Sequence, residues 1–439
     1  MKKPNVVIII SDQLSTRIVD GSGHNKHNVS TRGIDSIAKE GVRFTESYSA
    51  FPLCGPARSS IFTGMMPHNH NITDNEEVFN DQLGFIPRDE NIKTMGELFK
   101  KDGYETCYFG KEHAGGYGWK GIDNFGSMKF SAGGMLAEGS AFDQIFTKDA
   151  IDFINQEHKD PFYMTLSLIN PHDICKVLGG KVQGATFMDA IFFCRDDSEP
   201  YLRFNERASL PTNYDIPYIK GMIDDEDYMY KELDDRDENE WRQYISTYNL
   251  LVEKIDWYIE LVLEALKKNG LEEDTIVVFT TDHGDLMGSH KLIAKTNFYE
   301  ESAKTFMLVK YPKKIEPAIN SEAKISSIDL MPTLLDLCNI SAPSEIDGKS
   351  FKDALYNDNK NFDILVSENP FGKMIRYQSL KYIRSIIHGV EYEILLDLDK
   401  DPEESTNFIE DSSYQKKVIF LREYLNNYLK EKGIALNYR

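Results

Sequence analysis

The chain has 439 residues, of which 41% are hydrophobic and 28% charged, and 71 acidic against 50 basic residues give a formal net charge of −21. This composition is typical of a soluble globular protein with an ample core. Because so acidic a surface repels phosphate backbones and anionic lipids, we expect neither nucleic acid nor a membrane as a partner.

The first predicted element is a buried strand in the segment "NVVIII" (residues 5–10), which is continuously apolar and β-branched. Two lysines precede it, as in a secretory signal, but the apolar run is too short for one and no cleavage site follows. No stretch of the sequence has the length of a transmembrane helix. The five cysteines form no CxxC pair, which favours a reducing compartment. We therefore predict a cytoplasmic protein.

Helices and strands then alternate along most of the chain. Apolar residues at helical spacing, glycine stops and short β-branched runs recur in four segments: 30–44, 94–110, 160–173 and 244–285. Strands that alternate with helices are typical of a parallel sheet with helices on both faces. The sequence therefore predicts a large doubly wound, mixed α/β catalytic domain over residues 1–345.

The pattern changes after residue 345. Four short strands follow one another between residues 362 and 399, and an amphipathic helix is predicted over 413–433. This predicts a smaller α+β subdomain over 346–439, with a four-stranded antiparallel sheet and a terminal helix. The stretch 176–240 is acidic and aromatic without clear periodicity, so it is either a solvated surface or an insertion that faces a substrate.

Polar, ionisable residues follow four of the predicted strands. In open α/β sheets, ligands bind outside the carboxyl ends of the strands, so these side chains are expected to lie close together. Asp12 and Gln13 end the first strand, and Asp282 and His283 end a later one. Three oxygens and one nitrogen suit a hard cation, with Ca²⁺ as the first choice and Mg²⁺ or Mn²⁺ as alternatives.

A group of basic residues lies at the same strand ends and near Cys54, which precedes a helix predicted to start near Ala57. An acidic protein that binds an anionic substrate needs such local positive charge. The group consists of Arg58, Lys111, His113, His172 and Lys295. Taken singly, an aspartate at a strand end is usually a helix cap, and a buried cysteine is usually packing. The convergence of four strand ends and one helix N-terminus favours a functional site.

The segment "CGPARSSIFTG", which begins at Cys54, resembles the signature of the type I, formylglycine-dependent sulfatases of the alkaline phosphatase superfamily. Cysteine, proline and arginine stand in the family's positions, and Ala57 replaces the usual serine. The similarity covers nearly the whole chain and includes "PNVVIIISDQ", "GYETCYFGKEH", "DTIVVFTTDHGDLMGSHKLIAKTNFYEES" and "LLDLDKDPEESTNF".

The resemblance implies that a maturation enzyme converts Cys54 to formylglycine, whose hydrated aldehyde attacks the sulfur of a sulfate monoester. Asp12, Gln13, Asp282 and His283 then resemble the metal ligands, together with residue 54. Arg58 resembles the residue that orients the diol, Lys111 a sulfate contact, and His113 the base that helps to release sulfate. His172 and Lys295 resemble the pair beside the leaving oxygen, and His290 is a further candidate contact to the substrate.

The resemblance leaves the substrate class open between two alternatives. Hydrolysis of a sulfated mono- or oligosaccharide is the first, and substrate choice is expected to depend on the segments 114–140, 176–240 and 369–377. The combination of Gln13 and His283 also resembles phosphonate monoester and phosphodiester hydrolases of the same superfamily. A catalytically inactive binding protein is disfavoured because all the basic residues of the site are present. The oligomeric state is not predicted.

Overall fold

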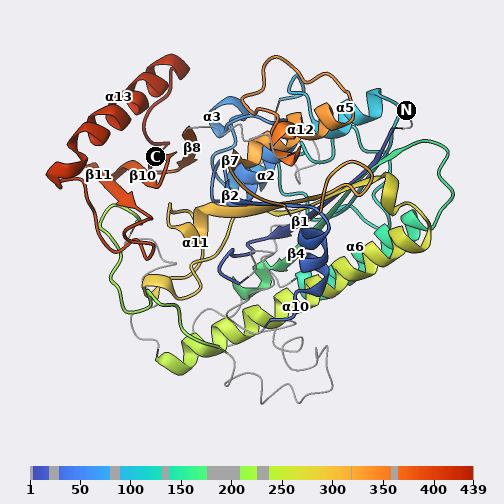
Figure 1. The fold of residues 1–439 in the computed structure, drawn as a ribbon, viewed down its shortest axis with the longest axis horizontal. Coiled ribbons are helices and arrows are strands. Elements are labelled where there is room, and N and C mark those ends of the chain that lie inside the picture. The colour runs from blue at the N-terminus through green and yellow to red at the C-terminus, as the bar shows by residue number, and fades with distance from the viewer. Residues whose placement is uncertain are drawn as a thin grey trace.

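The computed structural model describes residues 3–18, 29–79, 89–130, 138–175, 208–224, 237–317, 319–356 and 364–438. Its centre is a seven-stranded mixed sheet with the strand order β3-β4-β1-β5-β6-β2-β7 (Figure 1). The strands are β1 (Asn5–Asp12), β2 (Val42–Tyr48), β3 (Glu105–Gly110), β4 (Phe162–Pro171), β5 (Thr275–Thr281), β6 (Lys304–Lys310) and β7 (Ile319–Ser326). Neighbours among β3, β4, β1 and β5 pair in parallel, whereas β6 is antiparallel to both β5 and β2. The predicted mixed α/β sheet is confirmed.

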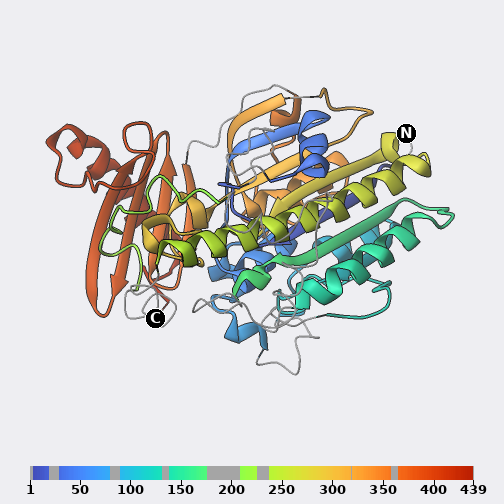
Figure 2. The same ribbon diagram turned by 90° about the horizontal axis from the view of Figure 1, so that it is seen from below.

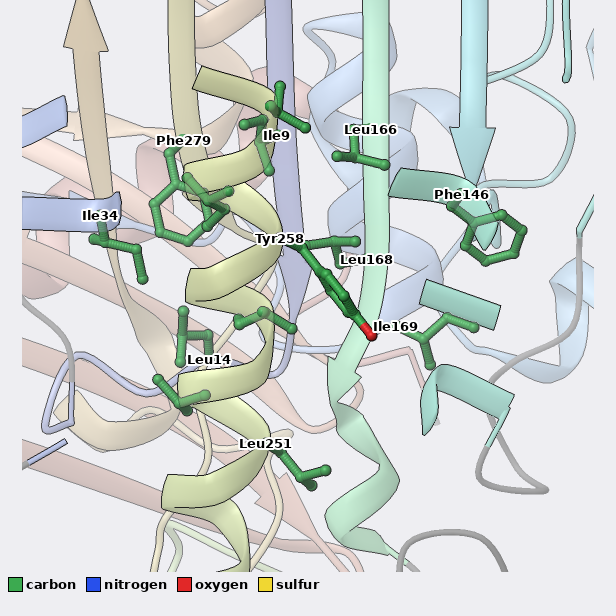
Figure 3. Close-up of a cluster of buried hydrophobic side chains, with 14 of the residues drawn as sticks. Ile9, Leu14, Ile34, Phe146, Leu166, Leu168, Ile169, Leu251, Tyr258 and Phe279 are labelled. Carbon is green, nitrogen blue, oxygen red and sulfur yellow. The ribbon is translucent and has the colours of Figure 1, made fainter. Parts of the chain in front are cut away.

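Helices cover both faces of this sheet. One face packs against α1 (Arg32–Lys39), α6 (Glu138–Ile154) and α10 (Glu238–Lys268), and the other against α2 (Cys54–Thr63), α5 (Met95–Lys101) and α12 (Leu330–Leu337). Alternate residues of β1 point to opposite faces, so Val7 and Ile9 join the first cluster and Val6 and Ile8 the second. Figure 3 shows the first cluster, in which the ring of Tyr258 of α10 points toward Leu168 and Ile169 of β4. This two-sided burial explains the continuously apolar sequence of β1.

The shorter elements connect these layers. They are α3 (Pro67–His70), α4 (Glu76–Phe79), α11 (Glu300–Ala303) and the 3₁₀ helices η3 (Glu272–Asp274), η4 (Ser289–Lys291), η5 (Ser327–Asp329), η6 (Lys352–Tyr356) and η7 (Ser412–Tyr414). None of the helices in the described ranges combines the length and apolarity that a membrane span requires.

Local capping sets where the long helix α10 begins and ends. Asp237 accepts hydrogen bonds from the backbone of Asn239 and Glu240, and the Glu240 side chain completes a capping box. The helix therefore starts six residues before the apolar pattern that predicted it. Gly270, at φ +66°, follows its C-terminus, as predicted.

The second sheet has the order β11-β10-β9-β8 and consists of β8 (Ile364–Asn369), β9 (Gly372–Tyr377), β10 (Leu380–Ile387) and β11 (Val390–Asp397). All neighbours are antiparallel, and α13 (Gln415–Lys432) covers one face (Figure 2). The other face packs on the large domain, where Met374 and Ile383 contact the cluster that contains Tyr48 and Leu286. The predicted antiparallel subdomain is confirmed. The boundary between residues 345 and 346 stays a prediction.

The structure describes only parts of the segments predicted to set substrate choice. Residues 131–137, 176–207 and 225–236 lie outside the described ranges. The segment 369–377 is the turn of the β8–β9 hairpin followed by β9.

Candidate active site

Four predicted site residues meet where β1 and β5 end and α2 begins. Asp12, Cys54, Asp282 and His283 each offer one ligand atom, and these atoms lie within 4.8 Å of one another. All four side chains are fully buried. The helix begins at Cys54 itself, three residues earlier than expected, because Leu53 is already the extended residue that precedes it. Residue 54 therefore stands at a helix N-terminus, where negative charge is stabilised.

The Cys54 thiol faces His283 and Asp12, with its Sγ 3.2 Å from His283 Nε2 and 3.7 Å from Asp12 Oδ1. Burial and Asp12 oppose ionisation of the thiol, but Lys295, Lys111 and His283 together lower its pKa below the ordinary value. His283 Nδ1 lies 2.9 Å from the carbonyl oxygen of Gly284. Since a carbonyl only accepts, Nδ1 carries a proton, and Nε2 is the ring nitrogen that faces the cluster.

Arg58 bonds to both Asp12 and Asp282 and fixes their positions. It lies four residues after Cys54, one helical turn along the same face of α2. Its Nε donates to Asp282 Oδ2 at 2.8 Å and its Nη2 to Asp12 Oδ2 at 3.0 Å, while Nη1 donates to Ser167 Oγ at 2.7 Å. The guanidinium has no exposed surface. One rigid fork thus fixes the spacing of both carboxylates.

Lys111 adds a second cation at Asp12, with its Nζ 2.7 Å from Asp12 Oδ2. Burial opposes ionisation of Asp12, but Lys111 and Arg58 hold its pKa well below the ordinary value. The site of this acidic protein therefore contains a local concentration of positive charge.

Gln13 is turned toward the basic side of the site. Its φ of 64° is left-handed, and its backbone nitrogen donates to Asp282 Oδ1 at 3.0 Å. The side-chain amide donates from Nε2 to Asp285 Oδ2 at 2.5 Å, and its Oε1 accepts from Lys295 Nζ and, at 3.6 Å, from Cys175 Sγ. The amide oxygen thus contacts Lys295 in this structure.

Two residues with no role in the sequence-based prediction anchor this side of the site. Asp285 is fully buried, and it accepts from Tyr244 at 3.2 Å and from the Met287 backbone at 2.8 Å in addition to Gln13. Cys175 is the other. Asp285 belongs to the "TTDHGD" motif, so its position just after a strand could have indicated a role in the site. Nothing in the sequence indicated such a role for Cys175.

His113 and His172 are both buried beside the cationic group. Burial, followed by the charge of Lys111, lowers the pKa of each imidazole well below its ordinary value, so both are neutral at pH 7. Among the described residues, His172 Nδ1 has no hydrogen-bond partner.

His290, predicted as a further substrate contact, is held in a different set of contacts. Its Nδ1 lies 3.0 Å from the carbonyl oxygen of Ile216, and its Nε2 lies 3.2 Å from Asn213 Nδ2. The ring stacks on Tyr299 with centroids 4.3 Å apart. Both nitrogens are thus engaged by the segment 213–216, and its contact with a substrate stays a prediction.

The fold and this site define a hydrolase for an anionic ester, with a possible site for a metal ion. Two carboxylates and an imidazole nitrogen surround a nucleophile position at a helix N-terminus, and this donor set fits a hard divalent cation. The ring of cations beside it suits the binding of a tetrahedral anion.

The sulfatase family profile matches residues 4–340, and the profile of the C-terminal part of N-sulphoglucosamine sulphohydrolase matches residues 288–431. The chain belongs to the sulfatase family and is a sulfuric ester hydrolase. Members of this family generally use a metal ion and a formylglycine. The cluster of Asp12, Cys54, Asp282 and His283 is a possible site for that ion.

Relatives and solved structures extend this similarity over the full length. A Delta 4,5-hexuronate-2-O-sulfatase of Bacteroides thetaiotaomicron is 29% identical, over 98% of this chain and 89% of the relative. An N-acetylglucosamine-6-O-sulfatase of the same organism is 26% identical, over 98% and 87%. The solved structure of a 2-O GAG sulfatase superposes with a TM-score of 0.81 at 27% identity and covers 100% of this chain and 95% of its own. The phosphonate monoester hydrolase of Agrobacterium radiobacter, at 18% identity and a TM-score of 0.75, covers 98% and 96% and shares the fold.

Proposed function

We propose that this chain removes the sulfate ester of a sulfated mono- or oligosaccharide, with one divalent cation, Ca²⁺ first among the candidates, and a formylglycine made from Cys54 by a maturation enzyme. The observation that carries the proposal is the convergence of Asp12, Cys54, Asp282 and His283 within 4.8 Å. The saccharide is supported by the two relatives above, whose names state activity on a hexuronate 2-O-sulfate and an N-acetylglucosamine 6-O-sulfate.

The cation would be held by Asp12, Asp282, His283 and residue 54, and by Gln13 once its amide oxygen leaves Lys295. When present, the cation supplies positive charge to the sulfate oxygens, and the hydrated formylglycine supplies a hydroxyl nucleophile. Both fit this position, because the helix N-terminus and the lowered thiol pKa show that the surroundings of residue 54 favour negative charge.

The remaining side chains bind the sulfate and move protons. Lys111 lies close enough to the cluster to contact a sulfate oxygen, and Arg58 fixes the carboxylates and the orientation of residue 54. His113 is neutral and can accept a proton as sulfate is released.

His172 and Lys295 are assigned to the leaving oxygen. The unpartnered Nδ1 of His172 leaves this imidazole free to hold a proton there. Burial opposes the charge of Lys295, but Cys54, Cys175 and Asp12 raise its pKa above the ordinary value. Because Asp12 remains after Cys54 is converted, Lys295 can still donate a hydrogen bond to the departing alcohol.

The test is release of inorganic sulfate by the chain co-expressed with a formylglycine-generating enzyme, with Cys54→Ala as the matched control. The substrates are a 2-O-sulfated hexuronate, an N-acetylglucosamine 6-O-sulfate, an aryl sulfate and an aryl phosphonate ester. Mass spectrometry of the peptide that contains residue 54 reports the conversion. Sulfate release from a sugar that is lost in the control supports the proposal. Faster cleavage of the phosphonate ester would instead favour the phosphonate monoester hydrolase, whose fold the chain shares.

A further inference from the structure

Lys373 of β9 is a buried ammonium that lacks an acceptor. Its side chain has no exposed surface, and among the described residues its Nζ makes no hydrogen bond. It lies over the ring of Tyr438, whose centroid is 3.9 Å from Nζ. Burying an ammonium without an acceptor costs several kcal/mol, so such a group is expected where a ligand completes its environment.

The carboxylate that faces Lys373 is already engaged by other groups. Glu368 of β8 stands directly opposite Lys373 in the antiparallel pair. Its Oε1 lies 2.9 Å from His68 Nδ1, and its Oε2 accepts from the Tyr438 hydroxyl. The charge of Glu368 therefore faces Lys373, but its oxygens bond to other side chains.

Two further polar atoms beside Glu368 also lack partners in the described parts of the chain. They are His68 Nε2 and the Tyr428 hydroxyl, and the two rings meet edge to face with centroids 6.1 Å apart. Lys373, His68 and Tyr428 thus gather three incompletely satisfied polar groups around one carboxylate. We call these residues, with Glu368 and Tyr438, the Lys373 cluster.

The Lys373 cluster lies next to the chain segments that carry Cys54 and Lys295. The Glu368 backbone donates to the Ala50 carbonyl at 2.9 Å, and the Tyr438 ring lies 6.2 Å from that of Phe51, three residues before Cys54. At the hairpin turn, Asn369 Nδ2 donates to the carbonyl of Thr296, the residue after Lys295, at 3.2 Å. The β8–β9 hairpin, which carries Lys373, therefore packs against the segments that carry Cys54 and Lys295.

We propose that Lys373 binds a second anionic group, a carboxylate or a further sulfate, on the same saccharide whose sulfate ester is cleaved at residue 54. The proposal rests on the proposed function and adds the residue that selects for acidic sugars. Burial lowers the pKa of Lys373 only to about 8, so the side chain is mostly charged at neutral pH and can attract an anion. The net charge of −21 makes such a local cation necessary for a doubly anionic substrate.

The first experiment compares Lys373→Met with wild type on three substrates. These are a uronic acid 2-sulfate, a disulfated glucosamine and a neutral sugar with one sulfate. In Lys373→Met, we expect kcat/KM for a substrate with a second anion to fall at least tenfold more than kcat/KM for the neutral sugar, mainly through a higher KM. We expect Lys373→Arg to restore part of this loss. The substrate that loses most distinguishes a carboxylate from a sulfate as the bound group. Equal losses on all three would overturn the proposal.

Stability and binding separate this role from a structural one. Lys381 of β10 is equally buried, but its Nζ donates to the Phe298 carbonyl at 2.7 Å and to Glu404 at 2.7 Å. We expect Lys381→Met to lower the urea unfolding midpoint and Lys373→Met to leave it unchanged or raised, and an equal fall in both would refute a ligand-binding role.

Calorimetry keeps this proposal independent of catalysis. In the Cys54→Ala background, Lys373→Met should weaken binding of the uronic acid 2-sulfate at least tenfold. Unchanged binding would overturn the role of Lys373 alone. Binding without any cleavage by the matured wild type would overturn the proposed function alone.

Discussion

Arg58→Lys tests whether the geometry of the guanidinium fork, and not only its charge, holds the site together. Arg58 makes three side-chain hydrogen bonds, to Asp12, Asp282 and Ser167, and a fourth to the Lys111 carbonyl at 3.1 Å. A lysine ammonium is a compact point charge that cannot reach both carboxylates in this fixed geometry. It keeps the net charge but leaves at least one buried aspartate without its partner.

The expected cost follows from these lost contacts. A buried hydrogen bond to a charged group contributes about 1.5–3 kcal/mol, and breaking a buried ion pair costs about 3–5 kcal/mol. We therefore expect Arg58→Lys to lower the free energy of unfolding by about 3–5 kcal/mol in a chelator. Saturating Ca²⁺ should recover part of it, because a bound cation takes over the charge of the aspartates and contributes about 2.7 kcal/mol at a hundred times its Kd.

The assay is urea unfolding followed by tryptophan fluorescence, with EDTA or with Ca²⁺. The control is Arg422→Lys, because Arg422 also makes a forked pair, with Glu393 at 2.7 Å, but is 43% exposed. At such an exposed pair the change should stay below about 1 kcal/mol. If Arg58→Lys unfolds like Arg422→Lys in EDTA, the fork does not organise the aspartates and our assignment of Arg58 is wrong.

Three further predictions concern acid stability, backbone space and metal binding. His70 Nδ1 accepts from the Ile72 backbone, so its Nε2 donates to Ser60, and burial lowers its pKa to about 3. Because the folded pKa of His70 is below the unfolded value near 6.5, stability that is present above pH 6.5 is lost on acidification, by about 2 kcal/mol at pH 5. Urea unfolding at a series of pH values should show this loss in wild type but not in His70→Gln. Equal slopes of unfolding free energy against pH in the two proteins would contradict it. A Cβ on Gly110 would lie 1.9 Å from the Ser167 carbonyl, whereas Gly103 has open space at a similarly positive φ, so Gly110→Ala should lower the melting temperature far more than Gly103→Ala. EDTA should lower the melting temperature of wild type but not of Asp12→Asn, and an equal response would place the cation elsewhere.

Much of the site could be predicted because a parallel sheet brings distant sequence positions to one edge. Asp12 and Asp282 lie far apart in the sequence, but β1 and β5 are neighbours in parallel register, so both strands end at the same place. Arg58 follows Cys54 by one helical turn, which by itself places both side chains on one face of α2. These contacts follow from secondary structure and strand direction, which the apolar pattern encodes.

The parts that could not be predicted depend on tertiary contacts. The direction of the Gln13 amide is set by Lys295 and Asp285, more than 250 positions away, and no local pattern encodes that choice. Lys373 lies in the segment 369–377 that was predicted to affect substrate choice, but nothing in the sequence distinguished this side chain, because a lysine in a β-strand is normally exposed. Only the packing of the β8–β9 hairpin against Tyr438 shows that its ammonium is buried with no acceptor among the residues that the structure describes.

The balance of charge at the site is compatible with binding of an anionic sulfate ester by an acidic protein. Asp12 and Asp282 would repel sulfate, but Arg58 and Lys111 already compensate them within a buried cluster, and a bound divalent cation would leave the site with a positive excess. Because each buried charge depends on its neighbours, removing any one of them should disturb stability and sulfate binding together. Lys373 differs in this respect, since no other residue in the described ranges depends on it for a hydrogen bond. Its loss should therefore affect binding without affecting stability, and this separation is what distinguishes a residue that contacts substrate from one that supports the fold.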